Sequence, residues 1–448
     1  SWRATGNSCP ENRQDSIQSA TASSGKGRSS STNGPHEPPG LPQRDVVDIL
    51  AFVVGTVVAV ALGGVVRRYS PAIGAVVPPR PDRWHSTPTP TMGGIAIALA
   101  TVAACVAALP FLELHLQGAD AAWIEVLLAA LAMWVVGILD DRLQLSPLAK
   151  LVASLAIGAF LVFLLVGAEP QGALPSSYTV IGTIWFAGIC HALNLLDNMD
   201  GLAAGVGLVA AVFLASLLGR DLGAPLVTIL AALVGALAGF LYWNRPPARL
   251  FMGDCGSLFI GSMLAGASLV PVFHTRVAFV SPAVLVVLIL IVPLFDTGFV
   301  LVLRRLAGRP ATKGGTDHVS HRLVSLGFSE RSAVRILYLF GIIGGLTAWG
   351  VAAGAAVEPM MPYLAIFFVV VILLGIYLAR VPAYDAQDFI ALQKSSFAPF
   401  LKDLAYKWHA GQVLLDVVLI AVCYYTAYRV RLEGDDLDNF FLPYVEST

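Results

Sequence analysis

Long apolar runs separated by short polar loops make up most of the chain beyond residue 45. A helix needs roughly 20 mainly apolar residues to cross a bilayer, and only helices or closed barrels satisfy their backbone hydrogen bonds in lipid. Twelve runs are long enough, and they start near residues 45, 93, 121, 148, 178, 202, 223, 256, 279, 332, 361 and 411. The pattern therefore predicts an all-α polytopic membrane protein.

The composition agrees with this class and excludes an ordinary soluble protein. Hydrophobic residues make up 56% of the 448 positions, charged residues make up 13%, and the mean hydropathy is +0.74. Soluble chains contain about 25% charged residues. The five cysteines are scattered without metal-ligand spacing, so we interpret them as small apolar side chains. We expect no nucleic-acid partner.

The two ends of the chain differ from the apolar body. Residues 1–44 are rich in Ser, Gly, Pro, Asn and Gln, so they cannot bury a core, and we expect a disordered leader. This leader lacks the apolar segment of a signal peptide. Residues 45–380 form the predicted membrane-embedded domain. Residues 381–448 are expected to form a linker and one additional transmembrane helix.

Lysine and arginine are distributed unequally between alternate loops, which predicts the orientation in the membrane. One set of loops carries fifteen cations, which are Arg67, Arg68, Arg80, Arg83, Arg142, Lys150, Arg245, Arg249, Arg304, Arg305, Arg309, Lys313, Arg322, Arg331 and Arg335. The other set carries two, Arg220 and Arg276. We therefore expect the first set to be cytoplasmic and the N-terminus to lie outside.

The stretch from Asn194 to Leu202 places an amide and two carboxylates between two membrane helices. Ionisable groups at such a position are costly and usually functional. Asn194, Asp197 and Asp200 are spaced three apart, close to one helical turn, so their oxygens are expected to point the same way. This arrangement suits a hard cation or a nucleotide.

Asp140 and Asp141 end another apolar run on the same predicted side, and Lys150 follows them. Two adjacent carboxylates repel each other unless a cation or a metal lies close. They are candidates for holding charge or for accepting a proton. The alternative is an ordinary solvated helix end.

A second acidic loop runs from Asn244 to Ser257. Gly253 and Gly256 surround Asp254 and allow the backbone to approach a ligand closely, as phosphate sites require. The alternative is an ordinary tight turn.

The longest predicted cytoplasmic loop, Arg304 to Arg335, contains His318, His321 and Arg322. Two histidines and an arginine within five residues can grip a pyrophosphate. The alternative is a simple contact with anionic lipid headgroups.

Other polar and conformationally special positions support this picture. Asp296 lies within an apolar run without an obvious partner, and we interpret it as structural support for the site. His191 and Glu125 are interpreted as satisfied structural groups rather than ligands. The prolines and paired glycines of Pro88–Gly94 predict an extended segment that approaches its neighbours closely.

Together these motifs resemble the polyprenyl-phosphate N-acetylhexosamine-1-phosphate transferase family, glycosyltransferase family 4. The resemblance covers about residues 45–380. Its six motifs, in the family's order, are Pro88–Gly94, Asp140–Asp141 with Lys150, Asn194–Gly201, Phe251–Ser257, Pro293–Asp296 and His318–Arg322. The family's fold implies about eleven transmembrane helices with a cytoplasmic active site, to which this chain adds one C-terminal helix.

The resemblance implies a role for each residue on the metal and lipid side of the site. Asp254 and Asn194 resemble the Mg²⁺ ligands, with Mn²⁺ as an alternative metal. Asp140 and Asp141 resemble a catalytic pair beside the lipid phosphate. Lys150 resembles the lysine that binds near them.

On the nucleotide side, the resemblance implies catalytic and substrate-binding groups that line the sugar-phosphate pocket or grip the pyrophosphate. The residues in these positions are Asp197, Asp200, Asn244, His318, His321 and Arg322. The chain departs from the family, which often has Asn where this chain has His191, Gly where it has Asn198, and a third histidine where it has Ser320. The missing histidine puts a full histidine cluster in doubt and leaves the metal site intact.

The implied activity is transfer of an N-acetylhexosamine-1-phosphate, with GlcNAc-1-phosphate favoured, from a UDP-sugar to undecaprenyl phosphate. UMP is released and a cell-surface glycan such as O-antigen is started at the bacterial inner membrane. Homodimers occur in this family. One alternative is the phospho-N-acetylmuramoyl-pentapeptide transferase branch, whose loop carries a longer run of histidines. A secondary transporter is an alternative of another class, but transporters bind their substrates near the midplane.

The segment after residue 385 leaves this resemblance. Lys407–Asp416, an apolar helix and Tyr428–Gly434 resemble the first membrane segment of membrane-bound nucleotide-sugar dehydratases. An extra accessory helix is the alternative.

Overall fold

The computed structural model of the chain describes residues 43–78, 88–112, 121–167, 176–219, 224–274, 280–306, 315, 317–353 and 361–381. They belong to the second of two compact units, Pro42–Thr448, and the first unit, Ser1–Leu41, lies outside the described residues. Nearly all of the predicted leader and of the predicted C-terminal linker, and the whole predicted C-terminal helix, also lie outside them. The boundaries of the three predicted domains therefore stay predictions.

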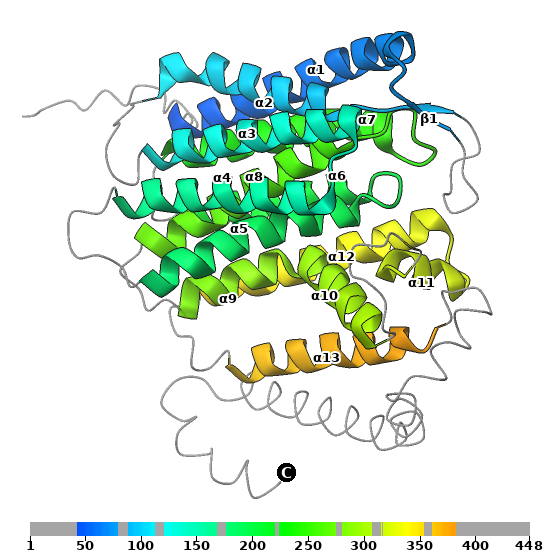
Figure 1. The fold of residues 1–448 in the computed structure, drawn as a ribbon. Helices are drawn as coiled ribbons and strands as arrows, with labels where there is room; N and C mark the ends of the chain where they lie inside the picture. The colour runs from blue at the N-terminus through cyan, green and yellow to red at the C-terminus, as the bar shows by residue number, and fades with distance from the viewer. Residues whose placement is uncertain are drawn as a thin grey trace, which may run out of the picture. The chain divides into compact units, whose positions relative to one another are not determined.

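Helices form almost all of the described structure (Figure 1). They are α1 Gln43–Tyr69, α2 Gly94–Ala108, α3 Ala122–Leu143, α4 Pro147–Gly167, α5 Ser176–Leu196, α6 Leu202–Leu218, α7 Ala224–Asn244, α8 Asp254–His274, α9 Val280–Ile289, α10 Ile291–Leu306, α11 Val319–Ser325, α12 Glu330–Ala353 and α13 Met361–Ala379. Two short 3₁₀ turns (Ser70–Ile73 and Leu109–Phe111) and the strands β1 (Val76–Val77) and β2 (Thr89–Pro90) complete it.

The prediction of an all-α polytopic membrane protein is confirmed. Within the described ranges, eight helices are long and apolar enough to cross a membrane, and the bent pair α9 and α10, with 77° between its halves, makes a ninth if it counts as one span. Two further apolar helices, Leu202–Leu218 and Leu364–Ala379, are shorter than the usual span. The total of about eleven spans stays a prediction.

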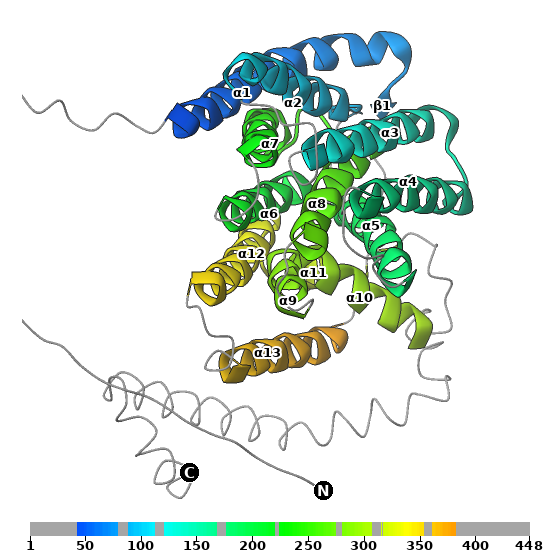
Figure 2. The same cartoon turned by 90° about the vertical axis from the view of Figure 1, so that its left-hand side faces the viewer.

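Helix α8 runs through the middle of the bundle, with α2, α3, α5 and α6 packed around it (Figure 2). In the apolar stretch of α8, 94% of the residues are buried inside the protein, whereas the figure is 22% for α1 and 28% for α4. Lipid gives no hydrophobic driving force between helices, so such packing depends on close backbone approach through small residues. The helix that begins with Asp254 is therefore the core of the described bundle.

Glycines bring α2 and α3 onto the first turn of α8. A Cβ atom on Gly94 would overlap the Gly256 backbone, and one on Gly137 would overlap the backbone of Cys255. Backbone atoms cannot rotate away as a flexible side chain can. The end of α3, which carries Asp140, is thereby held against the start of α8.

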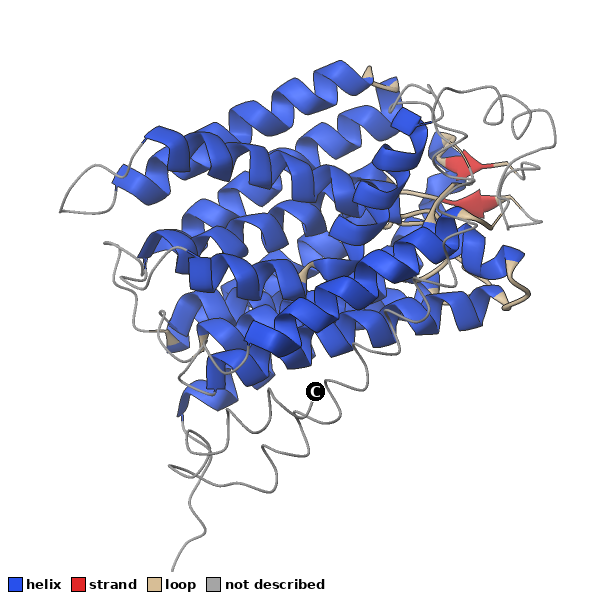
Figure 3. Ribbon diagram, turned by 90° about the horizontal axis from the view of Figure 1, so that it is seen from below, coloured by secondary structure: helices blue, strands red, loops and turns tan. Residues whose placement is uncertain are grey.

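The predicted extended segment Pro88–Gly94 is a strand at Thr89–Pro90 and turns into α2 at Met92, whose φ is +75°. β1 and β2 pair antiparallel with Val76 opposite Pro90, and they lie at one end of the helices (Figure 3). The Phe251 amide donates to the Pro90 carbonyl at 2.8 Å, and the Gly93 amide donates to the Phe251 carbonyl at 2.8 Å. These bonds tie the entry of α2 to the loop that leads into α8.

We expect Gly94→Ala to destabilise the protein by about 1–3 kcal/mol, because overpacking against a fixed backbone costs about that much. The measurement is thermal unfolding of the detergent-solubilised full chain. Gly350→Ala in α12 is the matched control, since nothing lies within 4 Å of a Cβ at that position. Equal melting temperatures for the two variants would contradict the proposed helix contact.

Candidate active site

A lysine shared by two aspartates joins the ends of three helices. The Lys150 ammonium, in the first turn of α4, lies 2.8 Å from Asp140 Oδ2 at the end of α3 and 3.0 Å from Asp254 Oδ2 at the start of α8. Only 9% of the Asp140 side chain and 18% of the Lys150 side chain are exposed. The ammonium thus offsets the repulsion between two carboxylates that are partly removed from water.

Asp141 has a different contact from its neighbour Asp140. Its carboxylate accepts the backbone N–H groups of Asp254 (2.8 Å) and Cys255 (3.1 Å), two of the amides that have no partner inside the first turn of α8. Gly253 makes room for it, with φ of +74° and a hypothetical Cβ only 2.7 Å from Asp141 Oδ2. Asp141 therefore positions the helix that carries Asp254, and its predicted catalytic role stays a prediction.

Asn194 lies beside Asp254, as predicted for two ligands of one metal. Its amide nitrogen donates to Ser257 Oγ at 2.9 Å, which orients the side chain. The metal-ligand role predicted for Asn194 stays a prediction. His191, one turn earlier on α5, contacts Ser154 Oγ through Nε2 at 3.1 Å. That contact agrees with the interpretation of His191 as a satisfied structural group.

The turn after α5 is fastened to the loop after α7. Asn244, 2% exposed, accepts the Gly201 amide at 3.0 Å and donates to the Leu250 carbonyl at 3.0 Å. Asp200 accepts the Ala248 amide at 2.7 Å. Both side chains therefore connect backbone segments in the structure. Their predicted substrate contacts, like the predicted catalytic role of Asp197 in the same turn, stay predictions.

A tyrosine that no sequence motif indicates also holds this turn. The Tyr338 hydroxyl, from α12, donates to the Gly201 carbonyl at 2.6 Å. Gly201 has φ of +79° and so suits glycine. No local spacing could have indicated a contact between residues 137 positions apart.

A buried ion pair and a buried histidine–aspartate hydrogen bond hold the start of α11 against α10. Arg304 binds Asp317 through two bonds of 2.6 and 2.7 Å, and Asp296 binds His318 Nδ1 at 2.7 Å and the Val319 amide at 2.8 Å. Burial would raise the pKa of the Asp317 carboxyl, but the Arg304 guanidinium outweighs this effect and lowers it. Asp296 thus has the supporting role expected from the sequence.

Arg322 is held by contacts inside the protein, and its predicted role in gripping pyrophosphate stays a prediction. Its side chain is 1% exposed, and Nη1 donates to the carbonyls of Leu378 (2.9 Å) and Val381 (2.6 Å) at the end of α13. The guanidinium also lies 5.1 Å from the centre of the Phe299 ring. A buried arginine committed to these carbonyls anchors α13, which a sequence motif cannot reveal.

The two predicted histidines lie close to each other. Their ring centres are 6.4 Å apart, His321 is 8% exposed and His318 is 4% exposed. Because His318 is bound to Asp296 by Nδ1, it orients the start of α11. The substrate contact predicted for His318 and the catalytic role predicted for His321 stay predictions.

The donor set suits Mg²⁺ bound together with a substrate. Among the described residues, no group of three or more His, Cys, Asp or Glu could hold a metal by itself. Mg²⁺ is usually bound by one or two carboxylates with substrate phosphates supplying further oxygens. The Asp254 carboxylate and the Asn194 amide oxygen are hard donors of this kind, and the Lys150 ammonium shows that the position attracts positive charge.

Comparison with known proteins decides the family. A family model for glycosyl transferase family 4 matches residues 123–272. The chain is 34% identical over 353 residues to decaprenyl-phosphate N-acetylglucosaminephosphotransferase of Mycobacterium tuberculosis (strain ATCC 25618 / H37Rv), which covers 71% of this chain and 85% of the relative. The chain belongs to the polyprenyl-phosphate N-acetylglucosamine-1-phosphate transferase family.

Other relatives of this transferase agree. A probable undecaprenyl-phosphate N-acetylglucosaminyl 1-phosphate transferase of Bacillus subtilis (strain 168) is 30% identical over 316 residues, 69% of this chain and 86% of the relative. A phospho-N-acetylmuramoyl-pentapeptide-transferase of Lactobacillus delbrueckii subsp. bulgaricus (strain ATCC BAA-365 / Lb-18) is 29% identical over 294 residues, 60% of this chain and 88% of the relative. The protein is therefore a multi-pass membrane transferase, and the transporter alternative is set aside.

Two departures of this transferase from the family pattern contact each other. Ser320 Oγ, on α11, donates to Asn198 Oδ1 at 2.7 Å, although the residues are 122 positions apart. Asn198 Nδ2 also donates to the Leu195 carbonyl at 3.0 Å, which fixes the orientation of the amide. The bond joins the aspartate turn after α5 to the histidine loop, so Ser320 provides a link between the two halves of the site.

A double-mutant cycle on this bond should show strong coupling. Ser320→Ala removes one hydrogen bond, and Asn198→Ala removes the same bond together with the one to the Leu195 carbonyl. The double variant should therefore lose about as much stability as Asn198→Ala alone, with a coupling of about 1 kcal/mol. The measurement is thermal unfolding of the full chain. As a control, Ser329→Ala combined with Asn198→Ala should be additive, since Ser329 pairs with Ser332. Additivity of the Asn198 and Ser320 changes would show that the bond contributes nothing.

Proposed function

We propose that this transferase moves N-acetylglucosamine-1-phosphate from UDP-N-acetylglucosamine to a polyprenyl phosphate and releases UMP. The Lys150 cluster carries the proposal, because it gathers two carboxylates and a cation where three helix ends meet. Relatives named as decaprenyl-phosphate and undecaprenyl-phosphate N-acetylglucosaminyl transferases support the donor and the class of acceptor. The product would start a cell-surface glycan.

The reaction exchanges one phosphoanhydride for another. An oxygen of the lipid phosphate forms a bond to the β-phosphorus of the UDP-sugar. The bond from that phosphorus to the bridging oxygen breaks, and its electron pair leaves with UMP. Such a transfer asks the protein mainly for positioning and for neutralisation of phosphate charge.

The residues of the Lys150 cluster divide this work. Lys150 holds Asp140 and Asp254 in place and adds a positive charge for the phosphates. Asp140 would accept the last proton of the lipid phosphate. Asp141 keeps the first turn of α8 in register.

Asp254 and Asn194 would hold Mg²⁺, or Mn²⁺ in its place. Bound there, the ion would act as a Lewis acid on diphosphate oxygens. His321 would neutralise further charge on the diphosphate, and the turn with Asp197 and Asp200 would border the nucleotide. The link between Ser320 and Asn198 supports this arrangement, because it fixes the histidine loop beside the turn.

We further propose that this side of the bundle faces the cytoplasm at the bacterial inner membrane. The fifteen cations on the site's side of the chain, against two on the other, support this orientation. A UDP-sugar donor made in the cytoplasm would reach such a site directly.

Phospho-N-acetylmuramoyl-pentapeptide transfer is the second candidate. The relative of that name at 29% identity favours it, while the relatives at 34% and 30% favour N-acetylglucosamine. The two donors differ in the sugar and not in the diphosphate, so the same cluster would serve either.

Purified protein with undecaprenyl phosphate and Mg²⁺ should release UMP from UDP-GlcNAc, and not from UDP-GalNAc or UDP-MurNAc-pentapeptide. Asp254→Ala should lower the rate by about 100-fold or more, as expected when a group that stabilises developing charge is lost. EDTA should abolish release and added Mg²⁺ should restore it. Asp45→Asn, an exposed carboxylate in the first turn of α1, is the matched control. Full activity in EDTA would show that the reaction does not require a bound metal ion.

Asp140→Asn should slow UMP release mainly at low pH. The second pKa of a phosphate is near 6, so above that pH the lipid phosphate is mostly ionised and no base is required. We therefore expect the ratio of variant to wild-type rate to fall as the pH drops from 8 towards 6. If the variant released UMP more slowly by the same factor at every pH, Asp140 would only hold Lys150 in place. If its rate were undiminished, Asp140 would not act as a base.

A further inference from the structure

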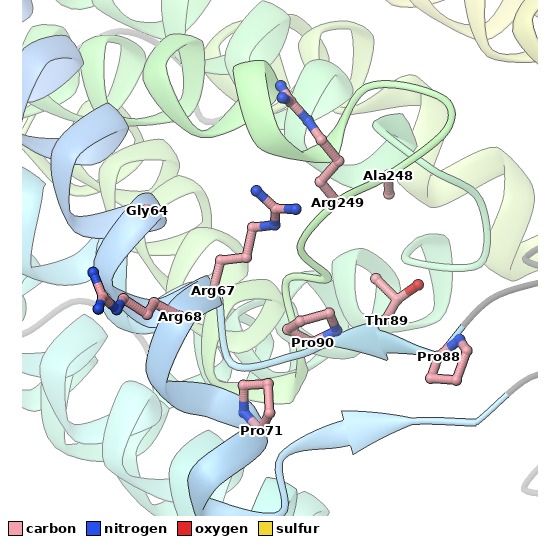
Figure 4. A pocket seen from close by; sticks show the side chains of 9 residues that line it. All are labelled: Gly64, Arg67, Arg68, Pro71, Pro88, Thr89, Pro90, Ala248 and Arg249. Atoms are coloured by element: carbon pink, nitrogen blue, oxygen red, sulfur yellow. The ribbon is translucent and has the colours of Figure 1, made fainter.

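A pocket lined by arginines opens at the end of α1, beside the loop that follows α7 (Figure 4). Its volume is about 540 Å³, and its lining includes Arg67, Arg68, Arg249, Thr89 and Ala248. In the described part of the chain, none of these arginines forms an ion pair with a carboxylate. Three positive charges thus border one space without a counter-charge from the described residues.

Aromatic rings hold two of these guanidinium groups. Arg67 lies 5.7 Å and Arg249 lies 4.9 Å from the centre of the Trp243 ring, and Arg249 lies 4.6 Å from that of Tyr242. The Trp243 indole donates to the Val60 carbonyl at 2.9 Å, which fixes the ring. One Arg249 N–H binds the Tyr242 carbonyl at 2.6 Å. Stacking on a ring fixes the plane of a guanidinium. The N–H groups at the edge of that plane can then bind an anion.

The pocket lies where two membrane-spanning helices end. Arg67 and Arg68 occupy the last turn of α1, in the span Asp45–Ile73, and Trp243 lies next to the end of the span Pro225–Asn244. Arginine and tryptophan at the ends of spans mark the headgroup region of a bilayer. Phosphate is the anionic group at that depth, and the forked guanidinium matches its oxygens.

We propose that this pocket binds the phosphate group of an anionic membrane lipid. The lipid is either an anionic phospholipid or the polyprenyl phosphate, since both carry a phosphate at the same depth. The phospholipid case is independent of the proposed function, whereas the polyprenyl case rests on it.

The occupied pocket would act on the loop that borders the active site. Ala248 lines the pocket, and its N–H donates to Asp200 at 2.7 Å. The next residue, Arg249, donates its backbone N–H to the Trp243 carbonyl at 2.8 Å. A lipid phosphate held by Arg249 steadies this loop and, through it, the turn that contains Asp200.

Native mass spectrometry of the full chain in detergent tests the proposal. The protein is titrated separately with phosphatidylglycerol, phosphatidylcholine, undecaprenyl phosphate and inorganic phosphate. The pocket variant is Arg67→Gln/Arg68→Gln. The matched control is Arg331→Gln/Arg335→Gln, which removes two exposed arginines from the start of α12. We expect the pocket variant to bind anionic lipid about 30-fold more weakly, at about fivefold per arginine near a membrane surface, and the control to bind as the wild type does.

The separate titrations distinguish the two sources of phosphate. Weaker binding of phosphatidylglycerol, with phosphatidylcholine unaffected, assigns the pocket to a phospholipid, and this result does not depend on UMP release. Weaker binding of undecaprenyl phosphate alone assigns it to the acceptor lipid. Arg249→Gln repeats the comparison if the double variant does not fold.

Three results would overturn the proposal. One is unchanged binding of both anionic lipids in the pocket variants. Another is an equal loss in the control variant, which would indicate a general effect of surface charge. The third is inorganic phosphate bound as tightly as the lipids with the same dependence on the arginines, because the site would then take a soluble anion.

Discussion

The ammonium of Lys150, shared between Asp140 and Asp254 at 2.8 and 3.0 Å, is the interaction on which the rest of the site depends. Two carboxylates at the ends of apolar helices would otherwise repel each other and lose hydration without compensation. Backbone packing sets the distance between them, because Gly137 lets α3 reach the start of α8 and Asp141 binds the first amides of α8. The ion pair therefore requires the close packing of α3 on α8, the most buried of the described spans. That packing in turn requires Lys150 to offset the repulsion between the two carboxylates.

A second buried network organises the opposite side of the site. Arg304 with Asp317 and Asp296 with His318 fix the start of α11 on α10, and Arg322 fixes α11 to the end of α13. Breaking one partner of such buried pairs would leave an uncompensated charge, so their geometry is strongly constrained. The histidine loop is consequently held by α10 and α13, and it meets the aspartate turn through side chains rather than through the backbone.

The loop between α7 and α8 connects the main parts of this membrane transferase. Its residues hold the aspartate turn through Asn244 and Asp200, pair with the segment that enters α2, and lead directly into Asp254. The same loop contributes Arg249 to the pocket at the membrane surface. A change in how a lipid occupies that pocket would reach the reacting groups through this one segment.

The sequence by itself determined the all-α membrane fold, because a backbone in lipid must satisfy its hydrogen bonds within helices. It also indicated the acidic and histidine motifs, because ionisable residues beside apolar runs are costly unless they serve a purpose. Only the tertiary structure decided which groups meet. Asp140 pairs with a lysine ten positions away, while Asp141 binds amides 113 and 114 positions away. Spacing along a chain fixes geometry over a helical turn or two, whereas the partners of Asp141, Arg322 and Ser320 depend on how separate helices pack.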